Sequence, residues 1–300
     1  MRFNIKSALK DFIPPIILRI YWRWRYVHSG RVQNPQITPS DTTRNAVLKN
    51  RHAGESRCFI LGNGPSLGIQ DLSPLKNEVV FVCNSFNLHP QCNVMSPRYW
   101  CMADPFSFIS KPSEKELNTG RDEWFADICT KAPNVQFFLP LMAREAIENK
   151  QWFQKNAIWY VNLGQAAVEL NYVDDDLTSR LPWAQGTINA LAIPAAIYMG
   201  FNKIYLLGCD SDWFIDNLIK KDFQAGMKHF YEQNPFMRES NIQDYGLEFW
   251  FRTGGEFFKS FRMWREFGER HGVEIYNATP GGLLDVFPRV DLKDILASRV

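Results

Sequence analysis

A short apolar run that leads directly into a glycine turn constrains this chain more than any other stretch. The run covers residues 58–61, and Gly62-Asn63-Gly64-Pro65-Ser66 follows it. Four consecutive apolar residues are typical of a strand that is buried on both faces. The glycines permit a sharp turn and a close approach of a ligand, while Pro65 and Ser66 suit the first positions of a helix. A strand, a tight turn and a helix N-terminus predict a phosphate or nucleotide loop, and the alternative is an ordinary strand-to-turn junction.

Six further apolar runs have the length of buried strands and are separated by helical or mixed stretches. They cover residues 78–84, 97–105, 135–140, 157–162, 203–210 and 273–277. Residues 187–200 and 255–271 are expected to form helices, the first with a kink at Pro194 and an end at Gly200. Short strands that alternate with helices predict an α/β fold with a mostly parallel sheet and helices on both faces.

The positive charge is concentrated at the start of the chain. Residues 1–60 contain 11 Lys and Arg and 3 Asp and Glu, a balance of +8, and the remaining 23 basic and 29 acidic residues give −6. A body with a net negative charge is a poor match for nucleic acid, so we expect no nucleic-acid partner. The 300 residues, 45% of them hydrophobic, suffice for one large catalytic domain, which we place at residues 57–300.

The first 30 residues combine aliphatic, aromatic and basic side chains. Residues 16–26 read Ile-Ile-Leu-Arg-Ile-Tyr-Trp-Arg-Trp-Arg-Tyr, a mixture typical of a helix that lies in a membrane interface. No apolar run here reaches the roughly 20 residues that a spanning helix needs. We therefore expect a basic amphipathic membrane-surface helix at residues 1–30, a linker or arm at residues 31–56, and a cytoplasmic protein held on the inner face of the cell membrane. The alternative is a terminal helix packed on the protein's own body.

The cysteines and histidines show no pattern of a metal site or of disulfides. The six cysteines, at positions 58, 83, 92, 101, 129 and 209, lack a C-x-x-C spacing, and several lie in apolar runs. Such cysteines are typical of buried thiols in a reduced compartment. The five histidines are scattered along the chain, so we expect no obligatory cofactor.

Polar side chains stand at the carboxyl ends of five predicted strands. They are Asn63, Asn84, Asp104, Asp210 and Asn277. A single Asn or Asp at a strand end is a common turn residue. The carboxyl ends of parallel strands, however, meet at one edge of a sheet, and ligands bind there. The five residues together predict a shared polar site at this edge.

The order of motifs along the chain resembles one known family. The motifs are Gly-Asn-Gly-Pro-Ser-Leu at 62–67, Val-Cys-Asn-Ser-Phe at 82–86, Ala-Asp-Pro at 103–105, Gly-Thr at 186–187, Ala-Ala-Ile-Tyr-Met-Gly-Phe-Asn-Lys-Ile-Tyr-Leu-Leu-Gly-Cys-Asp at 195–210, His-Phe-Tyr-Glu at 229–232 and Tyr-Asn-Ala-Thr-Pro-Gly-Gly at 276–282. Together they resemble the MptE-like (6-hydroxymethylpterin diphosphokinase-like) family, which includes the glycosyltransferase domains of motility-associated factors. More remotely, they resemble the bacterial lipooligosaccharide sialyltransferases. The resemblance spans about residues 57–290 and implies a Rossmann-like fold of glycosyltransferase type that binds a nucleotide donor.

The sialyltransferase resemblance also implies roles for individual residues. The positions that match contacts to the cytidine nucleotide are Gly62, Asn63, Gly64 and Asn84. In addition, Asp104-Pro105 corresponds to an Asn-Pro after the third strand, and Gly186-Thr187 corresponds to a small-residue turn before the buried helix.

Two departures from the sialyltransferase pattern concern the chemistry. Gln233 falls at the position of the family's histidine general base. Asp212 and Trp213 stand where tyrosines of the family hold the donor phosphate. The sequence therefore argues against a sialyltransferase with that mechanism.

Transfer of a sugar needs a base for the acceptor hydroxyl and a group that stabilises the leaving phosphate. His229 is the first candidate for the base, with Asp210, Asp212 and Glu232 as rivals. Asp210 and Asp212 are one residue apart and could hold Mg²⁺ or Mn²⁺ against a diphosphate. The alternative is a structural Asp210 with an accidental spacing.

A second glycine turn, residues 277–282, follows the last predicted strand. It is expected to close over the nucleotide or sugar, and the alternative is a chain-terminal turn. The complete set of expected nucleotide-binding residues is Gly62, Asn63, Gly64, Ser66, Asn84, Asp104, Gly186, Thr187, Asn277, Thr279 and Gly281.

The leading hypothesis is a bacterial glycosyltransferase at the inner membrane surface, in surface polysaccharide or lipopolysaccharide assembly. Its donor would be a nucleotide sugar, first of all a cytidine-activated acidic sugar, and its acceptor a glycan or a lipid-linked molecule. The first alternative is a pterin diphosphokinase that uses ATP and Mg²⁺. The second is a non-catalytic nucleotide-binding protein of the same pathway, which the missing histidine base favours.

Overall fold

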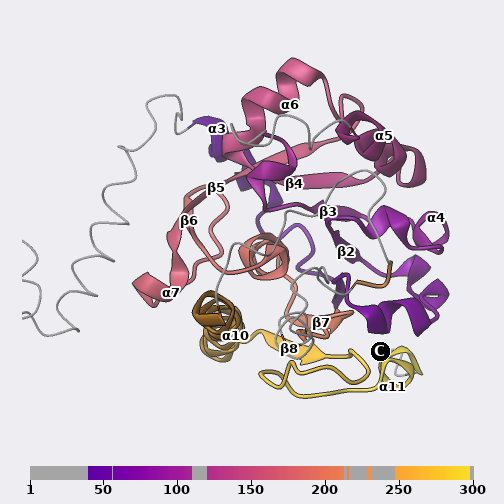
Figure 1. Ribbon diagram of the computed structural model, residues 1–300, viewed down its shortest axis with the longest axis vertical. Coiled ribbons are helices and arrows are strands. Elements are labelled where there is room, and N and C mark those ends of the chain that lie inside the picture. The colour runs from indigo at the N-terminus through magenta and orange to yellow at the C-terminus, as the bar shows by residue number, and fades with distance from the viewer. Residues whose placement is uncertain are drawn as a thin grey trace, which may run out of the picture.

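A computed structural model describes residues 40–55, 57–109, 120–212, 215, 229–231 and 247–297. Its centre is an eight-stranded sheet with the order β6-β5-β4-β3-β2-β1-β7-β8, in which every neighbouring pair is parallel (Figure 1). The strands are β1 (Cys58–Leu61), β2 (Val80–Cys83), β3 (Tyr99–Cys101), β4 (Gln136–Pro140), β5 (Ile158–Ala166), β6 (Arg180–Trp183), β7 (Lys203–Leu207) and β8 (Glu274–Asn277). The predicted Rossmann-like α/β fold is confirmed, and β6 is a strand that the sequence analysis missed.

Helices and single helical turns connect the strands. The α-helices are α3 (Ser40–Thr43), α4 (Cys92–Met95), α5 (Arg121–Lys131), α6 (Arg144–Lys150), α7 (Ala167–Leu170), α8 (Ile193–Tyr198), α10 (Leu247–His271) and α11 (Leu292–Ala297). The 3₁₀ turns are η1 (Arg44–Leu48), η2 (Pro65–Ile69), η3 (Ser73–Asn77), η4 (Phe86–Leu88), η5 (Pro105–Ser107) and η6 (Leu141–Ala143), and η7 (Ile188–Ala192) is a π-helix.

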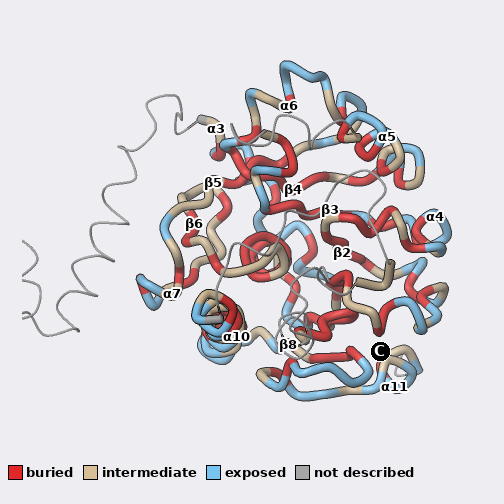
Figure 2. The backbone as a smooth tube through the Cα atoms, viewed as in Figure 1, coloured by how far each residue is buried: buried red, intermediate tan, exposed pale blue. Residues whose placement is uncertain are grey.

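The sheet separates two hydrophobic cores, because neighbouring residues of a strand face opposite sides. Cys58 and Ile60 of β1 point into the core under α8 and α10, whereas Phe59 and Leu61 point into the core under α4 and α5. Figure 1 shows α10 on one side of the sheet and α4 and α5 on the other, and Figure 2 shows the strands buried between them. Helices therefore cover both faces, as predicted.

The strand order reverses direction beside β1. The strands from β2 to β6 follow one another on one side of β1, while β7 and β8 lie on its other side. Ligands of open α/β sheets bind beyond the carboxyl ends of the strands at such a switch point. The glycine turn after β1 and the Gly208-Cys209-Asp210 segment after β7 both lie at this place.

The expected helix at residues 187–200 is divided by Pro194. Proline has no N–H to donate, and its ring excludes the carbonyl group four residues earlier. The chain adopts a wide π-helical turn over Ile188–Ala192 and continues as α8, with Pro194 in its first turn. Turns of this kind are frequent at functional sites, and Thr187 is the N-cap of this one.

Packing of the body begins before residue 57. Asn45 is fully buried and donates to the carbonyl groups of Tyr160 and Leu177, and Leu48 and His52 are buried as well. The described part of the expected linker or arm, residues 40–55, is thus an arm that packs against β5 and the start of β3. The expected helix at residues 1–30 lies outside the described residues, and no described helix is long and apolar enough to cross a membrane.

Candidate functional site

The glycine turn after β1 packs directly against the loop after β7. The N–H of Gly64 donates to the carbonyl oxygen of Gly208 over 2.9 Å. A Cβ atom at Gly62 would overlap that same carbonyl oxygen, and one at Gly64 would overlap the Asp210 carboxylate. Both positions therefore require glycine because a second segment of chain occupies the space of a side chain.

Asp210 caps the short helix η2 from across the switch point. Its Oδ1 accepts from the backbone N–H of Ser66 over 3.2 Å, and its Oδ2 accepts from the Ser66 hydroxyl over 2.7 Å. Burial and the nearby charge of Asp212 raise the pKa of Asp210. The sequence predicts that this helix N-terminus receives a ligand anion. That expectation stays a prediction; η2 has five residues, and the carboxylate of Asp210 accepts the N–H of Ser66.

Asn63 offers a buried hydrogen-bond acceptor in the same turn. Its Nδ2 donates to the carbonyl oxygen of Cys83 over 3.1 Å, which fixes the orientation of the amide. The Oδ1 atom is buried and has no hydrogen-bond partner among the described residues. A buried polar atom without a partner costs free energy, about 1–3 kcal/mol, so it marks a place where a ligand's donor would be favourable.

Asn84 and Thr187 form a second polar contact beside the turn. The Thr187 hydroxyl donates to Oδ1 of Asn84 over 3.1 Å. Asn84 has a φ of 47°, a left-handed conformation that is uncommon outside glycine and recurs at functional sites. Gly186, with a φ of 87°, precedes Thr187, and a Cβ there would lie 2.8 Å from the ring of Phe257. The first turn of η7 is thereby held at the end of β2.

The structure brings His229 to the glycine turn. The N–H of Phe230 donates to the carbonyl oxygen of Asn63 over 3.0 Å. The imidazole of His229 stacks on Tyr231, with ring centroids 4.7 Å apart. Burial lowers the pKa of His229, and a hydrogen bond with the Asn63 backbone opposes this in part. Glu232 and Gln233, the other residues considered for the base, lie outside the described residues.

The second glycine turn packs against the backbone of Cys209 and Asp210. The Thr279 hydroxyl accepts from the N–H of Cys209 over 3.0 Å, and the N–H of Leu283 donates to the Asp210 carbonyl over 2.6 Å. A Cβ at Gly282 would lie 2.7 Å from the Asp210 Cα. The buried side chain of Asn277 bonds within the turn, to the N–H of Thr279 and to the Leu284 carbonyl. These residues shape the loop that carries Asp210.

Arg289 donates hydrogen bonds to the carbonyl groups of this second turn. Its guanidinium donates to Thr279, Gly281, Gly282 and Leu284. Arginine presents five donors in a planar fork, which suits such multiple contacts. Arg289 is therefore a positioning residue of the turn.

Asp104 lies apart from this group. It is exposed, and its Oδ1 accepts from the N–H of Phe106 as the N-cap of η5.

Asp210 and Asp212 are close enough for their charges to interact, but both oxygens of Asp210 already accept from Ser66. Within the ranges that the structure describes, no group of three His, Cys, Asp or Glu residues could hold a metal ion.

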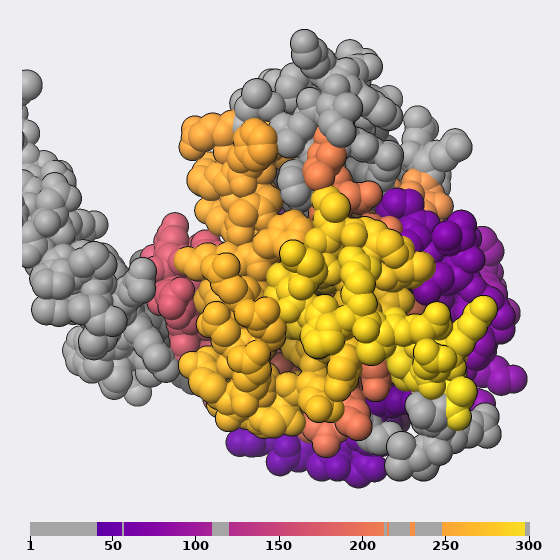
Figure 3. Space-filling view, turned by 90° about the horizontal axis from the view of Figure 1, so that it is seen from below, coloured from indigo at the N-terminus to yellow at the C-terminus, as the bar shows by residue number. Residues whose placement is uncertain are grey.

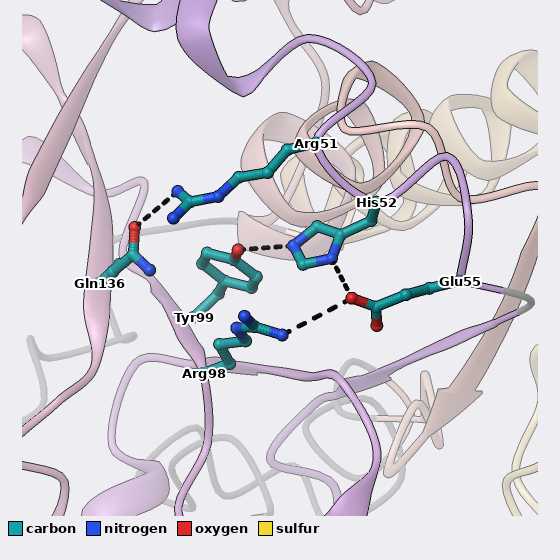
Figure 4. Close-up of polar contacts among 6 residues, drawn as sticks. All are labelled: Arg51, His52, Glu55, Arg98, Tyr99 and Gln136. Atoms are coloured by element: carbon teal, nitrogen blue, oxygen red, sulfur yellow. Dashed lines mark hydrogen bonds and ion pairs between the residues drawn. The ribbon is translucent and has the colours of Figure 1, made fainter.

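A different polar cluster, which the sequence did not predict, lies at the amino ends of the strands, here called the amino edge of the sheet. His52 Nδ1 is 2.6 Å from Oε1 of Glu55, and Nε2 is 2.7 Å from the Tyr99 hydroxyl. Figure 4 shows His52 between these partners, with Arg98 extending to Glu55. Burial lowers the pKa of His52 and raises that of Tyr99 to about 12, so both are neutral at pH 7. Tyr99 is fully buried and cannot reach a substrate, which makes this cluster a structural one.

A hollow of about 640 Å³ lies near that cluster. Arg51, Gln136, Lys155 and Trp159 are among the residues that line it. Gln136 begins β4, so the hollow is at the edge opposite the switch point and contains none of the predicted site residues. Arg51 donates to Gln136 there over 3.2 Å (Figure 4).

A comparison with solved structures finds a structural likeness. The chain is similar to the sialyltransferase CST-II, solved in complex with CMP, with 13% sequence identity and a TM-score of 0.43 over 82% of this chain and 89% of that chain. No protein-family model matches the chain, and no curated protein sequence matches it. The resemblance to the MptE-like family therefore remains a resemblance of motifs, and the fold itself is α/β with a parallel sheet.

Proposed function

We propose that this protein is a glycosyltransferase that uses a nucleotide-sugar donor, with the nucleotide bound beyond the carboxyl ends of β1, β2 and β7. The observation that carries the proposal is the buried, unpartnered Oδ1 of Asn63 in a glycine turn at the switch point of the sheet. The order of motifs along the chain supports the same class of ligand. The setting proposed is surface polysaccharide or lipopolysaccharide assembly in a bacterium, at the inner face of the cell membrane.

The charges of the turn indicate which part of the nucleotide it receives. Oδ1 of Asn63 is an acceptor, so its ligand atom must be a donor, such as a ribose hydroxyl or the amino group of a base. A phosphate group offers acceptors, and the carboxylate of Asp210 beside Ser66 would repel it. The turn therefore suits the nucleoside, and the phosphate would lie further from Asp210.

Cytosine can donate to Asn63 through its exocyclic amino group, whereas the Watson–Crick edge of uracil offers one donor, N3–H, between two carbonyl oxygens. It carries an amino group where uracil carries a carbonyl oxygen, and a carbonyl oxygen facing Oδ1 would be unfavourable. A cytidine-activated donor is accordingly the first choice. If Asn63 instead contacts the ribose, cytidine and uridine nucleotides bind equally well.

His229 is proposed as the general base for the acceptor hydroxyl. A base must be neutral before it accepts a proton, and the lowered pKa of His229 favours the neutral imidazole at pH 7. Its hydrogen bond with the Asn63 backbone supports the assignment, because Asn63 belongs to the glycine turn of the proposed nucleotide site. Asp210 serves in this proposal as a positioning group for the glycine turn.

We propose transfer without an obligatory metal. The Ser66 hydroxyl donates to Oδ2 of Asp210 over 2.7 Å. A cation held by Asp210 and Asp212 would have to displace this hydroxyl from the Asp210 carboxylate. If Mg²⁺ or Mn²⁺ does bind, these two aspartates are the residues that would hold it, and it would stabilise charge on the leaving phosphate.

A thermal-shift screen with CMP, UMP, GDP and ATP, each with and without Mg²⁺, tests the proposal. A ligand at 100 times its Kd adds about 2.7 kcal/mol to stability, which is readily visible. We expect stabilisation by CMP without Mg²⁺, and less by UMP. Stabilisation by ATP only with Mg²⁺ would favour a pterin diphosphokinase. Binding of CMP without sugar transfer to any glycan acceptor would favour a non-catalytic protein, and no response to any nucleotide would contradict the proposal.

A further inference from the structure

Most of the exposed large apolar side chains in the described part of the chain lie at one edge of the sheet. Seven such side chains are more than 40% exposed: Val47, Ile69, Val94, Phe106, Met142, Phe251 and Leu283. Single exposed apolar residues are normal on any protein, so their distribution is what matters here.

Five of the seven belong to segments at the carboxyl edge, where the candidate site lies. Ile69 ends η2 after the glycine turn, and Phe106 and Met142 follow the ends of β3 and β4. Leu283 donates its N–H to the Asp210 carbonyl in the second glycine turn. Val47 and Val94 lie in η1 and α4, away from these loops.

Phe251 belongs to the same side because of the direction of α10. This 25-residue helix ends at His271, just before β8 begins at the amino edge, so its start lies toward the carboxyl edge. Phe257, further along α10, packs on Gly186 near the end of β6. Figure 3 shows the start of α10 (orange, upper left) projecting beyond the yellow C-terminal segment.

The N-terminal segment joins the body at this same edge. Asp41 forms an ion pair of 2.5 Å with Arg144, which follows the end of β4. The arm then runs to the amino edge, where Arg51 donates a hydrogen bond to Gln136 at the start of β4. The described chain therefore begins at the carboxyl edge, and the sequence that precedes it, residues 1–39, carries seven Arg and Lys against one Asp.

We infer that the carboxyl edge of the sheet faces an anionic lipid surface. The exposed apolar side chains can enter the acyl boundary, while the cations of residues 1–39 are attracted to anionic headgroups. The body has a balance of −6, so the attraction to anionic headgroups comes from the cations of residues 1–39. A second copy of the chain would also cover apolar side chains, but it would bring another such cationic segment to the same edge. Lipid is therefore the occupant that the charge favours.

This orientation brings the candidate site to the lipid surface. Combined with the proposed function, on which this step rests, it makes the acceptor a lipid-linked molecule whose hydroxyl is presented at the headgroup level. The nucleotide donor would enter from the aqueous side of the same loops.

Co-sedimentation with vesicles tests the orientation in the full-length protein. The probes are vesicles of phosphatidylcholine alone and of phosphatidylcholine mixed with phosphatidylglycerol. One variant combines Phe106→Gln, Met142→Gln and Phe251→Gln at the carboxyl edge. The control combines Val47→Gln and Val94→Gln, which are 70% and 59% exposed away from this edge.

We expect the wild type and the control to bind the phosphatidylglycerol vesicles and the carboxyl-edge variant to bind about tenfold or more weakly. Equal binding by both variants, an equal loss in both, or a lipid-free dimer that the carboxyl-edge variant abolishes would overturn the inference. CMP titration of the same variants in solution separates the two proposals. Loss of vesicle binding with unchanged CMP affinity supports the orientation. Absence of CMP binding in every variant and in the wild type contradicts the proposed function, and the vesicle result then still tests the orientation by itself.

Discussion

Asp210 and Ser66 hold together the two loops that meet at the switch point of the sheet. The carboxylate accepts both the backbone N–H and the hydroxyl of Ser66, although the two residues are 144 positions apart in the sequence. This contact fixes the glycine turn after β1 against the loop after β7. The turn is thereby arranged before any ligand arrives, with its internal anion at the short helix and its free acceptor at Asn63.

Gly64→Ala should disrupt this arrangement. The backbone of Gly64, with φ −66° and ψ 156°, is acceptable for alanine, but the added methyl group would overlap the Asp210 carboxylate. We expect a loss of about 1–3 kcal/mol in the free energy of unfolding, measured by urea denaturation. Gly54→Ala is the control, since a Cβ there meets nothing within 4 Å.

Coupling to Asp210 checks the cause of that loss. In the double variant Gly64→Ala/Asp210→Ala the carboxylate is gone, so the closest contact of the methyl group is removed and the Gly208 carbonyl oxygen, 2.8 Å away, is its remaining close neighbour. The double variant should then lose less stability than the sum of the two single variants. Simple additivity would show that the overlap with Asp210 is not the reason.

The amino-edge cluster predicts a pH-dependent stability. The pKa of His52 is lowered by burial in the folded state, so the unfolded chain takes up the proton first. The contribution of neutral His52 is complete above the unfolded pKa of about 6.5 and is lost as the pH falls from there toward the folded pKa. His52→Gln should remove its own part of this slope and leave the parts of His89 and His229, whose pKa values are also lowered by burial, whereas His271→Gln, at an exposed position, should retain the whole slope.

Tyr99→Phe tests the same cluster at constant charge. The substitution removes the hydroxyl that lies 2.7 Å from His52 Nε2 and leaves that buried nitrogen without a partner. We expect a cost of about 1–3 kcal/mol at pH 7 in chemical denaturation. An unchanged free energy of unfolding would mean that the hydroxyl contributes nothing to the folded state.

His229 predicts the pH dependence of sugar transfer. With its pKa lowered by burial, the imidazole is neutral at pH 7, and the rate should fall only when the pH drops below that lowered pKa. His229→Gln should bind CMP like the wild type but lose turnover by about 10²-fold or more. Full activity in this variant would place the base elsewhere.

The sheet was largely predictable because parallel strands that are buried on both faces have continuous apolar sequences. Seven strands, including β1 and β7, matched such runs. The eighth, β6, reads Arg-Leu-Pro-Trp and gave no such signal. It forms the outer strand of the sheet, where a proline within a strand is tolerated.

The contacts of the site were less predictable than its residues. The sequence indicated polar side chains at the strand ends, but it could not show that Asp210 would occupy the start of η2 or that Asp104 would cap its own turn. Such pairings depend on the distance between segments far apart in sequence. The same holds for His52, whose partner Tyr99 begins a strand that the local pattern does not connect to it.

Calorimetric titration with CMP, comparing the wild type with Asn63→Ala, tests the central claim most directly. The exposed Asn134→Ala, at the amino edge, serves as the matched control, and thermal denaturation without ligand confirms that each variant is folded. The account predicts that the wild type and the control bind CMP with equal affinity and that Asn63→Ala binds about tenfold or more weakly, because a buried hydrogen bond to the nucleoside is lost. An unchanged Kd in folded Asn63→Ala would contradict it.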